Sequence, residues 1–191
     1  MPRRIRYRVA ASLDGYIAGP NGEADWIIKD PDIDFGELFN QFDTFVMGRG
    51  TFEYMVREQG SAAIPGMKVI VFSRTLRQKD NPDVTIVAEA SEKALTALRN
   101  ESGKDIWLFG GGSLFRSLLE MRTVDTVEIA VVPVLLGGGI PLLPTPAALT
   151  KLTLTGHRVY KKTGIVLLEY AVEYSAPRKA IKEKRTARGK S

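Results

Sequence analysis

Short stretches of the chain alternate between apolar and polar residues, which is the pattern of half-buried β-strands. The clearest runs from Arg4 to Ala11, where Ile5, Tyr7 and Val9 alternate with arginines. Further strands are predicted at 44–47, 68–72, 84–88, 106–109, 126–132, 151–160 and 165–174. A Lys-Thr-Gly turn at 162–164 separates the last two, so they should form an antiparallel hairpin.

Apolar residues recur at helical spacing between several of these strands. Helices are predicted from Asp34 to Phe42, from Ser91 to Asn100, and in the segments that follow Thr51 and Ser113. Thr51 is expected to cap its helix. Strands alternate with helices as far as residue 132, which predicts a three-layer α/β domain with a mostly parallel sheet and an antiparallel edge. The segments 12–22 and 135–146 are rich in Gly and Pro and should be loops.

The composition excludes several kinds of functional site. The chain has 191 residues, no cysteine and a single histidine, His157, which excludes a thiolate metal site, a disulfide scaffold and any site built from several histidines. The longest apolar run, 131–136, contains a proline and is too short to span a bilayer. We therefore expect a soluble, cytoplasmic protein without a membrane partner. No linker is visible within residues 1–174, which should form one domain.

The positive charge belongs to the end of the chain. Residues 175–191 hold seven basic residues and one acidic residue, whereas residues 1–174 hold 20 basic and 21 acidic residues. This basic tail contains one large apolar residue and no aromatic residue, so it cannot pack much. A solvated extension is favoured over contact with nucleic acid or another acidic surface.

Three predicted strands end in residues suited to binding phosphate. These residues are Gly48-Arg49-Gly50-Thr51, Ser73-Arg74 and Gly110-Gly111-Gly112-Ser113. Glycines between a strand and a helix let the backbone approach a pyrophosphate, and the free amides at the helix start hold its charge. A serine and an arginine suit a terminal phosphate. Because parallel strands end at one edge, these features together predict a phosphorylated dinucleotide lying across the sheet.

Five motifs in order resemble the dihydrofolate reductase-like superfamily, and within it the family that shares the reductase domain of bifunctional riboflavin-biosynthesis deaminase-reductases. They are the segments 12–18 (SLDGYIA), 47–53 (MGRGTFE), 71–76 (VFSRTL), 108–114 (LFGGGSL) and 132–139 (VPVLLGGG). The resemblance extends over residues 4–174. The deaminase half of such proteins needs a His/Cys/Cys zinc site, which this chain cannot build.

The resemblance implies an NADPH-dependent reductase acting on a small pterin-like or pyrimidine-like heterocycle, and a homodimer. It places the nicotinamide beside Ala10, Ala11 and Ile17, and the substrate beside Leu136 and Gly137. The implied cofactor-binding residues in the three strand-end loops are Gly48, Arg49, Thr51, Ser73, Arg74, Gly110, Gly111, Gly112, Ser113 and Leu114.

A true dihydrofolate reductase carries a buried carboxylate after the first loop, and both Asp32 and Asp34 lie near that position. Either could be the catalytic acid, because desolvation would raise the pKa of a carboxyl that faces the cleft. Either could equally be the cap of the following helix. Trp26 could stack on a planar substrate or fill the core. Asp14 could belong to a loop that closes over the nicotinamide, or to an Asp-Gly turn.

Hydride transfer from NADPH is the favoured interpretation of this pattern. The alternative is a protein that binds a dinucleotide without catalysis and regulates a partner. Binding of nucleic acid through the tail is a third, weaker hypothesis.

Overall fold

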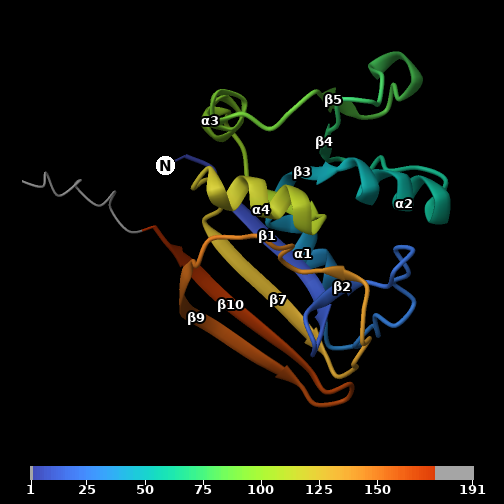
Figure 1. Cartoon of the computed structure of the whole chain (residues 1–191), viewed down its shortest axis with the longest axis vertical. Coiled ribbons are helices and arrows are strands. Elements are labelled where there is room, and N and C mark those ends of the chain that lie inside the picture. Colours follow the sequence, from blue (N-terminus) through green and yellow to red (C-terminus); the bar gives the residue numbers. More distant parts are fainter. Residues whose placement is uncertain (1, 175–191) are drawn as a thin grey trace, which may run out of the picture.

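The computed structural model describes residues 2–174, so the predicted basic tail at 175–191 lies outside the described residues. This part of the chain forms an eight-stranded sheet in the order β5-β4-β3-β6-β1-β7-β10-β9 (Figure 1). Its strands are β1 (Ile5–Ser12), β3 (Phe42–Gly48), β4 (Lys68–Phe72), β5 (Thr85–Val87), β6 (Asp105–Gly110), β7 (Thr126–Val132), β9 (Lys151–Tyr160) and β10 (Ile165–Glu173). The strands from β5 to β7 are parallel, and β10 runs antiparallel to both of its neighbours.

Helices cover both faces of this sheet, which confirms the predicted α/β architecture. The helices are α1 (Phe35–Asn40), α2 (Arg49–Gln59), α3 (Glu92–Asn100) and α4 (Gly112–Glu120). On one face α3 and α4 pack through Leu95 and Leu118 against a core that includes Ile5 and Leu108. On the other face α1 and α2 contribute Leu38, Phe52 and Met55 to a second core with Phe45 and Trp107. Alternation along the strands supplies both cores, since Val46 faces the first and Phe45 and Met47 face the second.

The predicted helix starts need one correction. The cap of α2 is Gly48, and Thr51 lies inside the first turn, so the prediction that Thr51 caps this helix is wrong. The predicted helix 34–42 is shorter, because Phe42 already begins β3. Ser91 caps α3 as predicted, with its side chain accepting from the amide of Ala94.

Two short strands, β2 (Tyr16–Ala18) and β8 (Ile140–Pro141), pair with each other inside segments predicted to be loops. They are too short for an alternating pattern to show. In the part of the chain from residue 2 to residue 174, no helix has the length and apolar character that crossing a bilayer requires.

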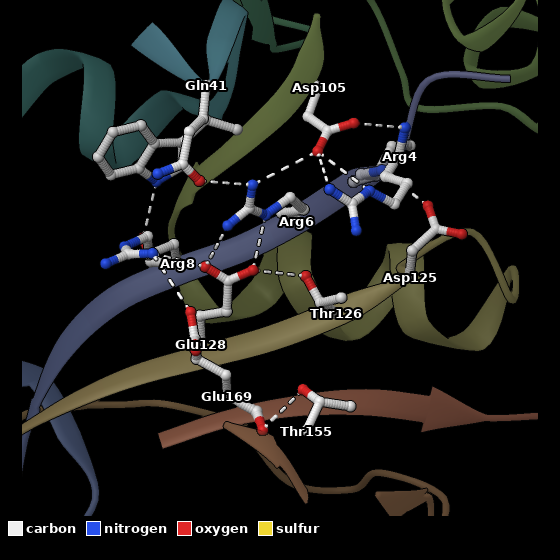
Figure 2. A network of polar contacts seen from close by, with 12 residues as sticks. Arg4, Arg6, Arg8, Gln41, Asp105, Asp125, Thr126, Glu128, Thr155 and Glu169 are labelled. Atoms are coloured by element: carbon white, nitrogen blue, oxygen red, sulfur yellow. Dashed lines mark hydrogen bonds and ion pairs between the residues drawn. The ribbon is translucent and has the colours of Figure 1, made fainter. Parts of the chain in front are cut away.

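The arginines of β1 lie on the face opposite Ile5 and Tyr7 and meet a buried carboxylate, Glu128 of β7 (Figure 2). Arg6 donates from Nε to Oε1 at 2.7 Å and from Nη2 to Oε2 at 2.8 Å. Arg8 donates to Oε2 at 2.8 Å, and the hydroxyl of Thr126 donates to Oε1. Burial alone would raise the pKa of Glu128, but these hydrogen bonds and the two positive charges outweigh it and lower the pKa.

Tyr7, unlike Glu128, buries a polar atom that has no hydrogen-bond partner among the described residues. Its ring stacks on Phe115 with centroids 3.8 Å apart. Its buried hydroxyl has no hydrogen-bond partner among residues 2–174, and burial raises its pKa. A hydroxyl buried in this way costs free energy, because it has exchanged water for apolar surroundings.

Tyr7→Phe should therefore raise the free energy of unfolding, by about 1 kcal/mol, since it removes the hydroxyl and keeps the stacked ring. Urea denaturation of both proteins measures the change. A clear loss of stability would mean that an ordered water satisfies the hydroxyl.

Glu128→Gln should lower the free energy of unfolding at neutral pH, by about 3 kcal/mol, because it leaves the buried Arg6 and the partly buried Arg8 with only their longer ion pairs to Asp105 and Glu169. The pKa of Glu128 is lower in the folded than in the unfolded protein. The stabilisation is therefore complete above the unfolded value of about 4.3 and disappears as the pH falls through the folded pKa. Urea titrations from neutral to acid pH should show the two proteins converging, and a pH-independent difference would contradict this account.

Candidate functional site

The three glycine- and arginine-bearing loops meet at one edge of the sheet. They follow β3, β4 and β6, which are parallel neighbours or next neighbours, so their carboxyl ends share that edge. Arg49, at the start of α2, reaches the loop after β4, with Nη1 3.4 Å from the hydroxyl of Thr75. Phe72, Ser73 and Arg74 line a hollow together with Leu114 of α4. The three loops therefore lie together at one edge, and the hollow lies between the loop after β4 and α4. We refer to this hollow and the adjoining loop ends as the groove.

Two of these loops touch through their backbones. A Cβ placed on Gly48 would lie 4.0 Å from the amide nitrogen of Gly111 and 3.8 Å from Cβ of Leu114. A Cβ on Gly110, whose φ is +151°, would lie 3.1 Å from the hydroxyl of Thr51. The peptide bond between Gly110 and Gly111 is cis. The start of α2 thus lies beside the start of α4, with the tightest approach between Gly110 and Thr51.

The starts of both helices lack a capping side chain. The caps are Gly48 for α2 and Gly111 for α4, and neither helix has an acidic residue in its first turn. The first amides of a helix have no partner within it, and the helix dipole adds partial positive charge there. Two such helix starts at one groove make a site suited to a polyanion.

Two central strands, β1 and β6, separate toward the same edge of the sheet. β1 and β6 are paired from Ile5–Ile106 to Tyr7–Leu108, and no later pair joins these two strands within the described residues. The indole nitrogen of Trp107 donates to the carbonyl oxygen of Arg8 at 2.7 Å and satisfies it where the ladder ends. The chain leaves β1 toward α1 on one face and leaves β6 toward α4 on the other, as the helices' cores show. Such a switch point is where open α/β sheets bind ligands.

The hollow beside the start of α4 is open and has a volume of about 470 Å³. Its lining residues are Phe72, Ser73, Arg74, Ala88, Glu89, Ala90, Leu114, Ser117 and Met121. The hydroxyl of Ser73 is buried and accepts from the amides of Thr75 and Leu76, so it also shapes its own turn. Arg74 pairs with Glu89, with Nη2 2.5 Å from Oε2. Sequence reasoning missed Glu89, although it lies two residues after the end of β5.

A second pair of loops, after β1 and after β7, is joined by hydrogen bonds. The carboxylate of Asp14 accepts from the amides of Leu136 and Gly137 at 3.1 and 2.7 Å. A hydrogen bond from Ser12 and these amides together hold the pKa of Asp14 below its usual value. The amide of Leu13 also donates to the carbonyl of Val134. Asp14 thus joins the loop after β1 to the predicted substrate loop.

The segment after β8 lies on the start of α4. A Cβ on Gly112 would lie 2.4 Å from the carbonyl oxygen of Pro141 and 2.9 Å from Pro144. Gly112 is therefore needed for this packing, whereas Gly111 has only the Thr51 hydroxyl, 3.5 Å away, near its Cβ position. Ser113 and Leu114 follow in the first turn of α4, Leu114 buried and Ser113 exposed.

The predicted nicotinamide neighbours lie where β1 ends. Ala11 is buried in the core under α3 and α4, and Ile17 of β2 packs against that core. Ala10 faces the other side, in a small cluster with Trp26, Val132 and Leu167. The indole of Trp26 donates to the carbonyl of Glu23 and is partly buried.

The structure places the two candidate acids in structural contacts. Asp34 caps α1, with its carboxylate accepting from the amide of Glu37 at 2.8 Å. Asp32 is exposed and pairs with Lys162 at 2.7 Å. Between them and Trp26 lies Asp30, a buried carboxylate that sequence reasoning missed; it accepts from the hydroxyl of Thr163 at 2.6 Å. Asp30 ties the loop before α1 to the β9–β10 turn.

Residues 3–167 match the RibD C-terminal domain family. YyaP, an uncharacterized protein of Bacillus subtilis (strain 168), is 35% identical over 179 residues, covering 88% of this chain and 94% of YyaP. A candidate riboflavin biosynthesis protein from Shewanella sp. PV-4 superposes with a TM-score of 0.72 at 25% identity, covering 91% of this chain and all of that chain.

Dihydrofolate reductase from Enterococcus faecalis has the same fold, with a TM-score of 0.62 at 18% identity over 88% of this chain and 94% of that chain. The family match and the YyaP match each span most of the chain. The protein therefore belongs to the RibD C-terminal domain family and has the dihydrofolate reductase-like fold.

Proposed function

We propose that this protein is an NADPH-dependent reductase that transfers a hydride to a C=N or C=O carbon of a small heterocycle. The observation that carries the proposal is that two uncapped helix starts lie side by side at the sheet edge where Arg74 lines a hollow. Membership in a reductase-like family supports it. The Enterococcus faecalis dihydrofolate reductase of the same fold was solved as a complex with NADP(H).

The residues present fit a phosphorylated dinucleotide. Gly111 leaves room at the start of α4, and the amides of Gly112, Ser113 and Leu114 would hold a pyrophosphate there. Gly48, Arg49 and Thr51 would complete the cradle from α2. Arg74 and Ser73 would receive the 2′-phosphate in the hollow. When bound, the nicotinamide supplies the hydride.

In the proposed reaction, the residues of this chain orient the nicotinamide and the substrate and shield them from water. The split between β1 and β6 would receive the nicotinamide beside Ala10, Ala11 and Ile17. The loops joined by Asp14 would exclude water on the substrate side, where Leu136, Gly137 and Trp26 are the proposed contacts. Asp32 and Asp34 stay predictions as proton donors, since one is paired with Lys162 and the other caps α1.

Turnover is tested by mixing the protein with NADPH and a panel of pterin, pyrimidine and cyclic imine substrates. We expect the absorbance of NADPH to fall with at least one of them. Tight binding of NADPH without oxidation by any substrate would favour the alternative, a regulatory protein that binds a dinucleotide without catalysis.

Gly111→Val should abolish NADPH binding and leave the fold intact, because its side chain would fill the cradle and meet only the hydroxyl of Thr51. Isothermal titration measures affinity, and circular dichroism measures the fold. Ala63→Val, on an exposed loop after α2, is the control for added bulk and should bind NADPH normally. Unchanged affinity in Gly111→Val would remove the cradle from the proposal.

We further propose that two copies associate through the β9–β10 hairpin. One face of the hairpin carries Leu152, Leu154 and Val159, which are 42%, 52% and 53% exposed, and the register sets them beside Val172, Tyr170 and Val166. None of the four described helices lies over β9 and β10 (Figure 1). An apolar sheet face of this kind is typical of an interface.

Leu154→Lys should convert the dimer to a monomer, because it places a charge at the centre of this face. Sedimentation velocity gives the oligomeric state. Val56→Lys, which changes an exposed apolar residue of α2, should leave the dimer unchanged. A wild-type monomer, or a dimer that survives Leu154→Lys, would exclude this interface.

A further inference from the structure

The ion pair of Arg74 and Glu89 occupies the hollow proposed for the adenosine end of the dinucleotide. β4 and β5 are parallel neighbours with Phe72 beside Val87, and the amide of Ser73 donates to the carbonyl of Val87 at 2.9 Å. Both side chains therefore leave the sheet at the same level, each two residues after that pair. Their closest nitrogen and oxygen are 2.5 Å apart.

This pair contributes little to the fold. The side chains of Arg74 and Glu89 are 77% and 61% exposed, and an ion pair this exposed stabilises a protein little, because water and salt screen it. Both residues line the hollow. The pair therefore acts mainly on a ligand that enters the hollow, because the carboxylate of Glu89 contacts the guanidinium of Arg74 and offsets its positive charge.

The two groups favour different ligands. A guanidinium binds the 2′-phosphate of NADPH through several donors. A carboxylate near the same ribose accepts from the 2′-hydroxyl of NADH and repels a 2′-phosphate. One pair thus offers both kinds of recognition at a single place.

Resting on the proposed function, we propose that Glu89 sets the cofactor preference: it competes with the 2′-phosphate for Arg74, accepts the ribose hydroxyl of NADH, and so lets the site take either dinucleotide. Removing its charge should free Arg74 for the phosphate. The preference, defined as the Kd for NADH divided by the Kd for NADPH, should then rise.

The neighbouring loop provides a matched control. Arg77 and Asp80 form another exposed pair, 2.7 Å apart, which does not line the hollow. Asp80→Asn removes the negative charge that pairs with Arg77, as Glu89→Gln removes the one that pairs with Arg74. It therefore measures the general effect of one less negative charge near the site.

The test measures the Kd of NADPH and of NADH by isothermal titration for the full-length wild type, Glu89→Gln and Asp80→Asn. We expect Glu89→Gln to tighten NADPH by about fivefold, to weaken NADH, and to lose this advantage as salt is raised. Asp80→Asn should keep the wild-type preference. In an Arg74→Ala background, Glu89→Gln should no longer tighten NADPH by the same factor.

An unchanged preference in Glu89→Gln, or an equal rise in Asp80→Asn, would overturn the proposal while leaving dinucleotide binding in place. A gain in NADPH affinity that persists in full without Arg74 would also overturn it, because Glu89 would then act by repulsion alone. A wild-type protein that binds neither dinucleotide would refute the proposed function and this inference with it.

Discussion

Two helices on opposite faces of the sheet begin at neighbouring backbone atoms, and the groove depends on this approach. The Cβ position of Gly48 lies 4.0 Å from the amide nitrogen of Gly111, an ordinary contact distance, so the two helix starts lie side by side with room between them. Added bulk at Gly111 would therefore fill that room and would not force the helices apart. The positive ends of two helix dipoles meet here, which is an arrangement suited to an anion even though the described residues have no cluster of lysines at this edge.

The buried charges of the central strands lie toward the amino ends of the parallel strands, away from the helix starts. Arg6 of β1 contacts Glu128 of β7, Asp105 of β6 and Gln41 just before β3, so one guanidinium links three strands and the end of α1 (Figure 2). Arg8 extends the contacts toward Glu169 of β10. The contacts of Arg6 join β1 to both of its neighbours before the last β1–β6 pair, Tyr7 with Leu108. The cost of burying charge is offset here by several hydrogen bonds to each of the two buried groups, Arg6 and Glu128.

Most of the fold could be predicted from the sequence, because its strands alternate regularly and its turns carry glycine. β4, β7 and β9 have the predicted bounds. The errors lie where local pattern and tertiary contact disagree. The start of α2 was misplaced because Thr51 is a good capping residue, whereas the chain turns at Gly48 so that α2 can approach Gly110. β2 and β8 exist only through pairing with each other.

The candidate site was predictable as a set of strand ends but not as a set of contacts. Because the carboxyl ends of parallel strands share one edge of a sheet, Arg49, Arg74 and Gly111 come to the same edge. Which acidic residue pairs with each arginine depends on how the strands are aligned. The sequence alone does not give the alignment of β4 with β5, so it could not show that Glu89 lies beside Arg74. Asp32 and Asp34 were equivalent in the sequence, and only the structure separates a partner of Lys162 from a helix cap. Asp30 gave no pattern, since its partner Thr163 lies in the distant β9–β10 turn.

The carboxylate of Asp14 fastens two loops that are more than a hundred residues apart in the chain, through the amides of Leu136 and Gly137. The amide of Leu13 also donates to the carbonyl of Val134, so the two loops are joined by side-chain and backbone bonds together. A displacement of one loop therefore requires the other to move with it or these bonds to break.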